Sequence, residues 1–307
     1  MFIPLTIFSQ TENRKDSELC SERKRSSTNI FFEGDSPNSP KHSYDVLDYK
    51  LNLDIRNCFI TPFPRSFTGS VVIKFRIDTA LGSINLNAIN TSIVVSSVGM
   101  SGVSFTHTGN ILNVVLNRVY NPGEVTEVLV NYSHNNVVDG AIYTGNGGFF
   151  TDAPPEGARK WFPCWDKPSD KATVDITLKV PSNVKIGSNG RLNDSTVTGD
   201  TTYYHWISRD PVATYLVVLT GKVNYNLNIV YWPKLSNPSD SIPLRFYFNT
   251  GENPVAMQNA VVNMTTYFSQ KFGEHGFEKN GFATAPATGF NWAGMESQTL
   301  TSLCPNC

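Results

Sequence analysis

The residues best suited to chemistry lie near the end of the 307-residue chain, in the run NWAGMESQTLTSLCPNC. Glu296 is a lone carboxylate there, and it follows the small residues Ala293 and Gly294. A carboxylate that is shielded from water forms a charge-assisted contact with an ammonium group, and small neighbours let a ligand approach the backbone. The pattern is therefore compatible with a loop that binds a cationic group, although most exposed glutamates have no such role.

The second candidate is the C-x-x-C pair of Cys304 and Cys307. Such a pair can be half of a zinc site or a redox pair, but no second pair follows at zinc-finger spacing. We interpret it as a structural turn and assign no metal to it, with a small disulfide loop as the alternative in an exported protein. The remaining cysteines are widely spaced, and the odd total of five argues against a disulfide framework.

The run ARKWFPCWDKPSDKATVDITLKVP, residues 158–181, combines charged, aromatic and proline residues. We expect a rigid corner packed with aromatic rings, in which Arg159 and Asp166 form a partly buried ion pair. Cys164 has no histidine nearby in the sequence, and a reactive thiol needs an electropositive setting. The run is therefore predicted to be structural rather than catalytic.

The composition is that of a globular protein, with 17% charged and 12% aromatic residues. A net charge of -1 provides no basic surface for nucleic acid or acidic lipid. No run approaches the ~18 apolar residues of a membrane-spanning helix. The start MFIPLTIFSQ resembles the last part of a signal peptide, which predicts an exported protein, periplasmic or extracellular. An ordinary N-terminal strand or arm is the alternative.

The elements that must position these residues are mostly strands. Residues 1–10 are the possible signal-peptide remnant, and 11–43 are polar and predicted to be a linker. From Tyr44 the sequence alternates apolar and polar residues at period two, which predicts a mainly β fold, a sandwich or saddle, over 44–240. Its strands are predicted at YKLNLDI, GSVVIKFRI, LGSINLNA, NILNVVLN, TEVLVNYS, ATVDITLKVP, VKIGSNG, TYYHWIS, TYLVVLTG and LNIVYW.

The sequence pattern changes at residue 241, where the strand LRFYF precedes a helix predicted over 253–272. Asn253 is its expected N-cap, Pro254 its first residue and Gly273 its end. The apolar stripe is expected to comprise Val255, Val262, Tyr267 and Phe268. Residues 241–307 therefore look like the start of a further domain that is not complete.

Five ordered motifs give the chain a family resemblance. ARKWFPCWDKPSDKA, SNGRL, TYLVVLTGKV, FGEHGFEKNGF and AGMESQTLTSL follow one another from residue 158 to 303. This order resembles the M1 family of zinc aminopeptidases, which are gluzincins. The resemblance implies an N-terminal β-saddle domain over 44–240, followed by the start of a thermolysin-like α+β catalytic domain over 241–307.

The resemblance also implies roles for individual residues. In the family the glutamate of a G-x-M-E-N loop binds the free α-amine of a peptide, and that role falls on Glu296. Ala293, Gly294 and Met295 belong to the same substrate-binding loop, which would lie along the peptide as an added strand. A second amine contact falls on Asp152, with a turn-forming aspartate as the alternative.

The family's zinc is held by an H-E-x-x-H helix and a glutamate on the next helix. None of the five histidines belongs to such a motif: His42, His107, His134, His205 and His275. We therefore predict an N-terminal fragment that ends before this helix, with no catalytic or metal residue of its own. Zn²⁺ is expected in the full-length protein, together with peptide substrates recognised by their free N-terminus.

Several positions depart from the family pattern. Ser297 stands where the family usually has asparagine, His275 and Gly276 replace Tyr-Pro, and Asn280 replaces a usual tyrosine. These departures concern substrate preference more than membership. Two other functions stay open: a non-catalytic module that binds peptides or proteins, and a β-sandwich accessory domain of a carbohydrate enzyme. The ordered motifs argue against the latter, and the coding sequence beyond Cys307 would test the former.

Overall fold

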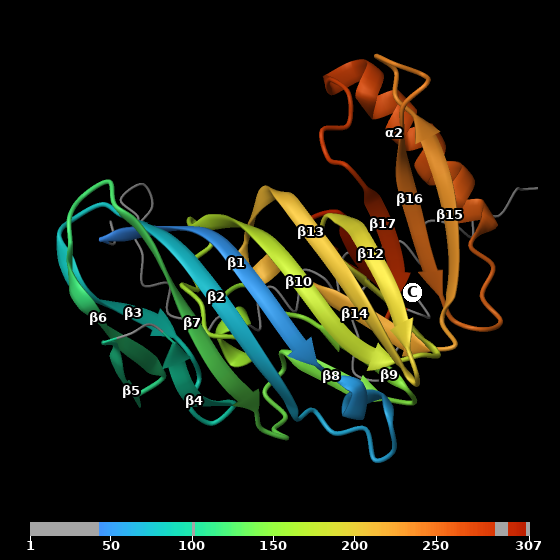
Figure 1. Ribbon diagram of the computed structural model, residues 1–307. Coiled ribbons are helices and arrows are strands. Elements are labelled where there is room, and N and C mark those ends of the chain that lie inside the picture. Colours follow the sequence, from blue (N-terminus) through green and yellow to red (C-terminus); the bar gives the residue numbers. More distant parts are fainter. Residues whose placement is uncertain (1–42, 100–101, 286–293, 305–307) are drawn as a thin grey trace, which may run out of the picture.

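The computed structural model describes residues 43–99, 102–285 and 294–304, and these residues form a mainly β protein (Figure 1). This confirms the predicted fold class. The expected signal-peptide remnant, almost all of the expected linker, Ala293 and Cys307 lie outside the described residues. In the described ranges no helix is both long and apolar enough to span a membrane.

The largest element is a twisted seven-stranded sheet whose central strand comes first in the chain. In spatial order its strands are β12 (Arg191–Thr198), β13 (Thr201–Ala213), β10 (Lys171–Pro181), β1 (Tyr44–Asp54), β2 (Phe67–Ile77), β7 (Val125–His134) and β4 (Ile93–Gly99). β1 pairs antiparallel with β2 and parallel with β10. Alternating burial along β1 and β10 agrees with the period-two pattern of their sequences.

Three smaller sheets complete the structure. A four-stranded sheet has the order β11 (Val184–Ser188), β14 (Leu219–Val223), β9 (Gly148–Thr151) and β8 (Ile142–Gly145). A three-stranded sheet has the order β3 (Leu81–Asn87), β6 (Ile111–Tyr120) and β5 (Ser104–Thr108). A five-stranded sheet has the order β15 (Asn226–Pro233), β16 (Ser241–Phe248), β17 (Asn280–Thr284), β19 (Leu300–Leu303) and β18 (Gly294–Ser297). Short 3-10 turns span Arg56–Phe59, Ala158–Lys160 and Thr214–Leu216.

One apolar core joins the first three of these sheets. It contains Leu51 and Ile176 from the seven-stranded sheet, Ile186 and Leu219 from the four-stranded sheet, and Leu112 from the three-stranded sheet. The five-stranded sheet has separate, smaller apolar clusters. Figure 1 shows it standing at the β12–β13 end of the large sheet.

The corner at residues 158–166 has the predicted ion pair. Arg159 Nε lies 2.9 Å from the Asp166 carboxylate, whose side chain is fully buried. The same carboxylate accepts hydrogen bonds from Thr214 Oγ1 at 2.6 Å and from the Arg159 backbone N–H at 3.1 Å. Cys164 is buried with a free thiol, and burial, helped by the Asp166 charge, raises the pKa of that thiol well above its ordinary value. This agrees with the prediction that residues 158–181 have a structural rather than a catalytic role.

The single α-helix of the described residues, α2 (Val255–Phe272), corrects two details of the prediction. Its N-cap is Pro254 rather than Asn253, although Asn253 Oδ1 still accepts a hydrogen bond from Val255 N at 3.1 Å. The expected stripe is wrong at three of its four positions. Val255, Tyr267 and Phe268 are exposed, whereas Val262 packs against the cluster of Trp232 and Ile242 as predicted, together with Met257 and Val261. The physical reason is that residues five apart, such as 262 and 267, lie about 140° apart around a helix.

The outer side of α2 therefore exposes apolar side chains. Phe272 is 84% exposed, and Met264, Tyr267 and Phe268 are also exposed. Patches of this kind on a protein surface usually mark a contact with further polypeptide.

We predict that Asp166→Ala lowers the free energy of unfolding by about 3 kcal/mol, because Arg159 and Thr214 lose a fully buried partner. Urea unfolding followed by tryptophan fluorescence measures this loss. The matched control is Arg118→Ala, which removes an exposed pair with Glu124 and should cost at most about 1 kcal/mol. Equal losses for the two variants would contradict the structural role of the corner.

Candidate functional site

Glu296 lies in a β-hairpin rather than in the expected loop. β18 and β19 pair antiparallel, and Glu296 stands opposite Thr301. The small residues of this segment suggested a loop, but the backbone is extended and β18 forms the outer strand of the described five-stranded sheet. The Glu296 side chain is exposed. An outer strand with a free edge can pair with an extended peptide, and here it carries a carboxylate.

Asp152 lies at the end of a strand of the four-stranded sheet. It follows β9 directly, is only 6% exposed and donates its backbone N–H to Ala141 O at 2.9 Å. Two residues earlier, Phe150 belongs to one apolar cluster with Met295, the neighbour of Glu296. The strand β9 that precedes Asp152 and the strand β18 that contains Glu296 thus meet in this cluster.

The same cluster contains other hairpin contacts. Tyr143 stacks on Phe150 with ring centroids 4.6 Å apart, and Ala285 and Cys304 also pack there. Cys304 is disulfide-bonded. Gly294 lies opposite Leu303, where a Cβ would come within 3.3 Å of Ser302 O, so this position suits a small residue. The predicted neighbour Ala293 falls outside the described residues.

The hairpin is attached to the β domain through the tripeptide Ser188-Asn189-Gly190. The Gly190 N–H donates to Thr299 Oγ1 in the hairpin turn at 2.8 Å. Gly190 has a φ of +67°, and a Cβ there would lie 2.0 Å from Ile207 O. No side chain fits at this point, which explains a requirement for glycine.

Lys279 forms a second attachment. It precedes β17, is 1% exposed, and its Nζ donates to Ser188 O at 2.7 Å. The Nζ also lies 5.2 Å from the centre of the Trp206 ring, where it makes a cation–π contact. Burial, and then the nearby Arg245 charge, lowers the pKa of Lys279 well below its ordinary value. Sequence reasoning missed Lys279 and Thr299 as attachment residues, and their only signal was their place within matched motifs.

The described residues of this site do not form a ligand set for a catalytic metal. Across residues 43–99, 102–285 and 294–304, no three His, Cys, Asp or Glu side chains are grouped so that they could hold a metal ion. The printed sequence also contains no H-E-x-x-H. The zinc that the family resemblance implies therefore finds no fitting ligand set among the described residues.

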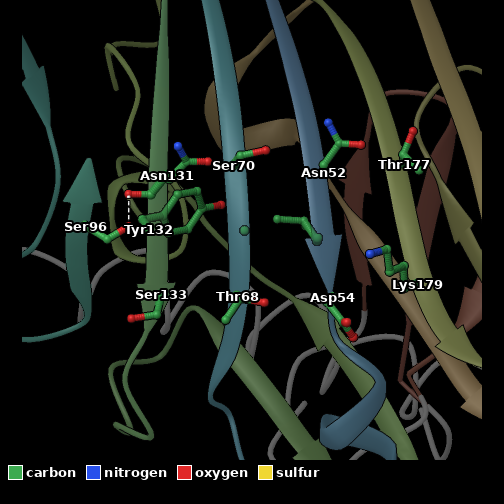
Figure 2. Close-up of a pocket in the computed structure, with 12 residues that line it drawn as sticks. Asn52, Asp54, Thr68, Ser70, Ser96, Asn131, Tyr132, Ser133, Thr177 and Lys179 are labelled. Atoms are coloured by element: carbon green, nitrogen blue, oxygen red, sulfur yellow. Dashed lines mark hydrogen bonds between the residues drawn. The ribbon is translucent and has the colours of Figure 1, made fainter. Parts of the chain in front are cut away.

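A separate hollow of about 490 Å³ lies on the outer face of the seven-stranded sheet (Figure 2). Figure 2 shows Thr177, Asn52, Ser70 and Asn131 side by side across four strands, in agreement with their register. These short hydroxyl and amide groups contain no nucleophile with a base beside it. The hollow offers a contact surface of mixed polar and apolar character, on different strands from Glu296.

Comparisons with known proteins match this architecture. The model of the Peptidase M1 N-terminal domain matches residues 41–216. Aminopeptidase M1 of Arabidopsis thaliana is 28% identical over 242 residues, which are 72% of this chain and 26% of that protein. Aminopeptidase M1-A of Oryza sativa subsp. japonica is 30% identical over 203 residues, which are 58% of this chain and 22% of that protein. The chain thus spans about a quarter of the length of these relatives.

A solved structure has the same fold. It is a mutant M1 zinc metallopeptidase from Deinococcus radiodurans bound to a Tyr-Ser-Ala substrate, with a TM-score of 0.73 and 22% identity. The match covers 86% of this chain and 61% of that one. At this identity the likeness establishes the fold alone.

We predict that Gly190→Ala destabilises the protein by roughly 3 kcal/mol, since it combines a positive φ with a backbone clash. The matched control is Gly199→Ala. Gly199 has a φ of +62° but nothing within 4 Å of its would-be Cβ, so the loss there should be about 1 kcal/mol. The midpoints of urea unfolding measure the loss in each variant. Similar losses would show that the backbone at Gly190 can move away from Ile207 and accommodate a Cβ.

Proposed function

The chain belongs to the M1 peptidase family, and we propose that it forms the N-terminal part of a zinc-dependent aminopeptidase that releases N-terminal amino acids from peptides. Family membership rests on the domain match over 41–216. The names of the relatives, aminopeptidases and a zinc metallopeptidase, support the activity of the longer protein.

The observation that carries the proposal is the placing of Glu296. Its exposed carboxylate stands on an outer strand, next to Met295, which shares an apolar cluster with Phe150 of the Asp152 segment. A peptide that pairs along β18 would bring its N-terminal ammonium to this carboxylate. Asp152 is proposed as a second amine contact from the family resemblance alone. An internal peptide bond has no ammonium, so the contact selects chain ends.

The catalytic step itself is proposed to need residues that this sequence does not contain. In metallopeptidases zinc supplies a nucleophilic water and polarises the carbonyl. The exposed apolar side of α2, with Phe272 and Met264, is proposed as a contact surface for further polypeptide. Residues 241–307 and the β domain are proposed to act as one support for the substrate. Export of the protein remains a prediction.

The alternative is a non-catalytic module that binds peptides or proteins. The hollow around Asn52 and Asn131 is the observation that favours it. The two functions differ in what they recognise, because only the amine site requires a free N-terminus.

We predict that the chain binds a short peptide with a free N-terminus more tightly than its N-acetylated form, and that Glu296→Gln removes most of this preference. A charge-assisted contact is worth roughly 1.5–3 kcal/mol once the bound peptide shields the exposed Glu296 carboxylate from water, so the preference should be on the order of tenfold or more. Titration by calorimetry or NMR measures both affinities.

The control is Glu127→Gln, which makes the same chemical change at an exposed position of β7 and should leave the preference intact. Equal binding of both peptides by the unaltered chain would contradict the amine site. Loss of all peptide binding only when the hollow is altered, for example by Asn131→Trp, would favour the binding module.

We also predict that the purified 307-residue chain has no peptidase activity, because it lacks the zinc ligands and the general base. The measurement is release of a chromophore from an aminoacyl substrate, with and without added Zn²⁺. Zinc-dependent turnover that disappears with a chelator would contradict this prediction.

A further inference from the structure

We propose that Asn189 is a positioning residue: its side-chain amide holds the hairpin of Glu296 in place relative to the segment of Asp152. The inference rests on the proposed function, since it concerns how the two candidate amine contacts keep their spacing. Asn189 itself touches neither of them.

Asn189 is 1% exposed, and its amide joins three backbone positions. Its Oδ1 accepts a hydrogen bond from Val218 N at 2.8 Å. Its Nδ2 donates to Leu216 O at 2.9 Å and to Gln298 O at 2.7 Å. Both donor hydrogens are thereby used, and one amide links segments that are far apart in the chain.

One side of this link leads to Asp152. Val218 is followed by Leu219, whose backbone N–H donates to Thr151 Oγ1 at 2.9 Å. Thr151 is the residue directly before Asp152. The position of the Asp152 backbone is therefore tied to the segment that Asn189 holds.

The other side leads to Glu296. Gln298 lies in the turn between β18 and β19, two residues after Glu296. The next turn residue, Thr299, has a φ of +68°, which is unusual for a β-branched residue, and its Oγ1 accepts the Gly190 N–H. A strained turn persists where its surroundings hold it, and here the tripeptide holds both turn residues.

The chemistry requires an amide at position 189. An aspartate would keep the acceptor for Val218 N but would place a carboxylate against the two carbonyl oxygens of Leu216 and Gln298. An alanine would leave three buried backbone groups without their partner. The side chain thus acts as a spacer of fixed length between two sheets.

The test uses hydrogen exchange of the backbone amides of 294–303 in the 307-residue chain, with strands β1, β2 and β10 as an internal reference. We expect Asn189→Ala and Thr299→Ala to speed exchange of the hairpin about tenfold or more, because each removes a buried hydrogen bond. Ser188→Ala is the matched control. It removes a buried bond from Ser188 Oγ to Val218 O at 2.8 Å but leaves the hairpin contact, so hairpin exchange should change little.

Thr299→Ser keeps the hydroxyl and should restore the slow exchange that Thr299→Ala loses. This pair tests the neighbouring bond from Gly190 N–H to Thr299 Oγ1. If Asn189→Ala does not fold, Asn189→Asp tests the amide itself, because it keeps the acceptor for Val218 N but loses the donor to Gln298 O. Hairpin exchange that stays unchanged in both alanine variants, with the reference strands intact, would overturn the proposal.

Peptide binding separates this proposal from the proposed function. We expect Asn189→Ala to reduce the preference for a free over an acetylated N-terminus about tenfold, the effect of losing one charge-assisted contact. If the hairpin opens but the preference is unaltered, Asn189 does not position the anchor and the proposal fails. If the unaltered chain shows no preference, the proposed function fails, while the exchange data still decide whether Asn189 fixes the hairpin.

Discussion

The arrangement of the described chain depends on a backbone contact that leaves no space. At Gly190 the chain passes so close to Ile207 that a Cβ would lie 2.0 Å from its carbonyl oxygen. On either side of this contact, hydrogen bonds run to the hairpin turn and to the buried Lys279 amine. These contacts of backbone and buried groups attach the five-stranded sheet to the β domain. Glu296 lies on the sheet that they attach.

Much of the fold can be read from the sequence where burial alternates strictly. β1, β2 and β10 have one face in the core, so their apolar residues recur at period two. β12 was not predicted. It is an edge strand exposed on both faces, so its sequence does not need alternating apolar and polar residues. The helix was predicted within two residues, but its buried face is decided by Trp232 and Ile242, which no local pattern reveals.

The candidate site was only partly accessible to the same reasoning. Glu296 and Asp152 were named because their motifs resemble a family pattern, and the structure places their neighbours in one apolar cluster. The hairpin was mistaken for a loop because Gly294–Ser297 has no alternation to mark a strand. Asn189 had no visible role, since its partners lie 27, 29 and 109 residues away and are backbone atoms. A hydrogen bond to a backbone atom does not depend on the residue type of the partner, so the sequence does not reveal it.

The central place of β1 also bears on how the protein is made. β1 pairs in parallel with β10, and Asp48 and Thr173, a hydrogen-bonded pair across them, are 125 residues apart. During synthesis at ~5–20 residues per second, one edge of β1 stays unpaired for on the order of ten seconds after it has been made. An apolar strand with an open edge attracts other strands. The nascent chain is therefore expected to need shielding, by the ribosome surface or a chaperone, until β10 emerges.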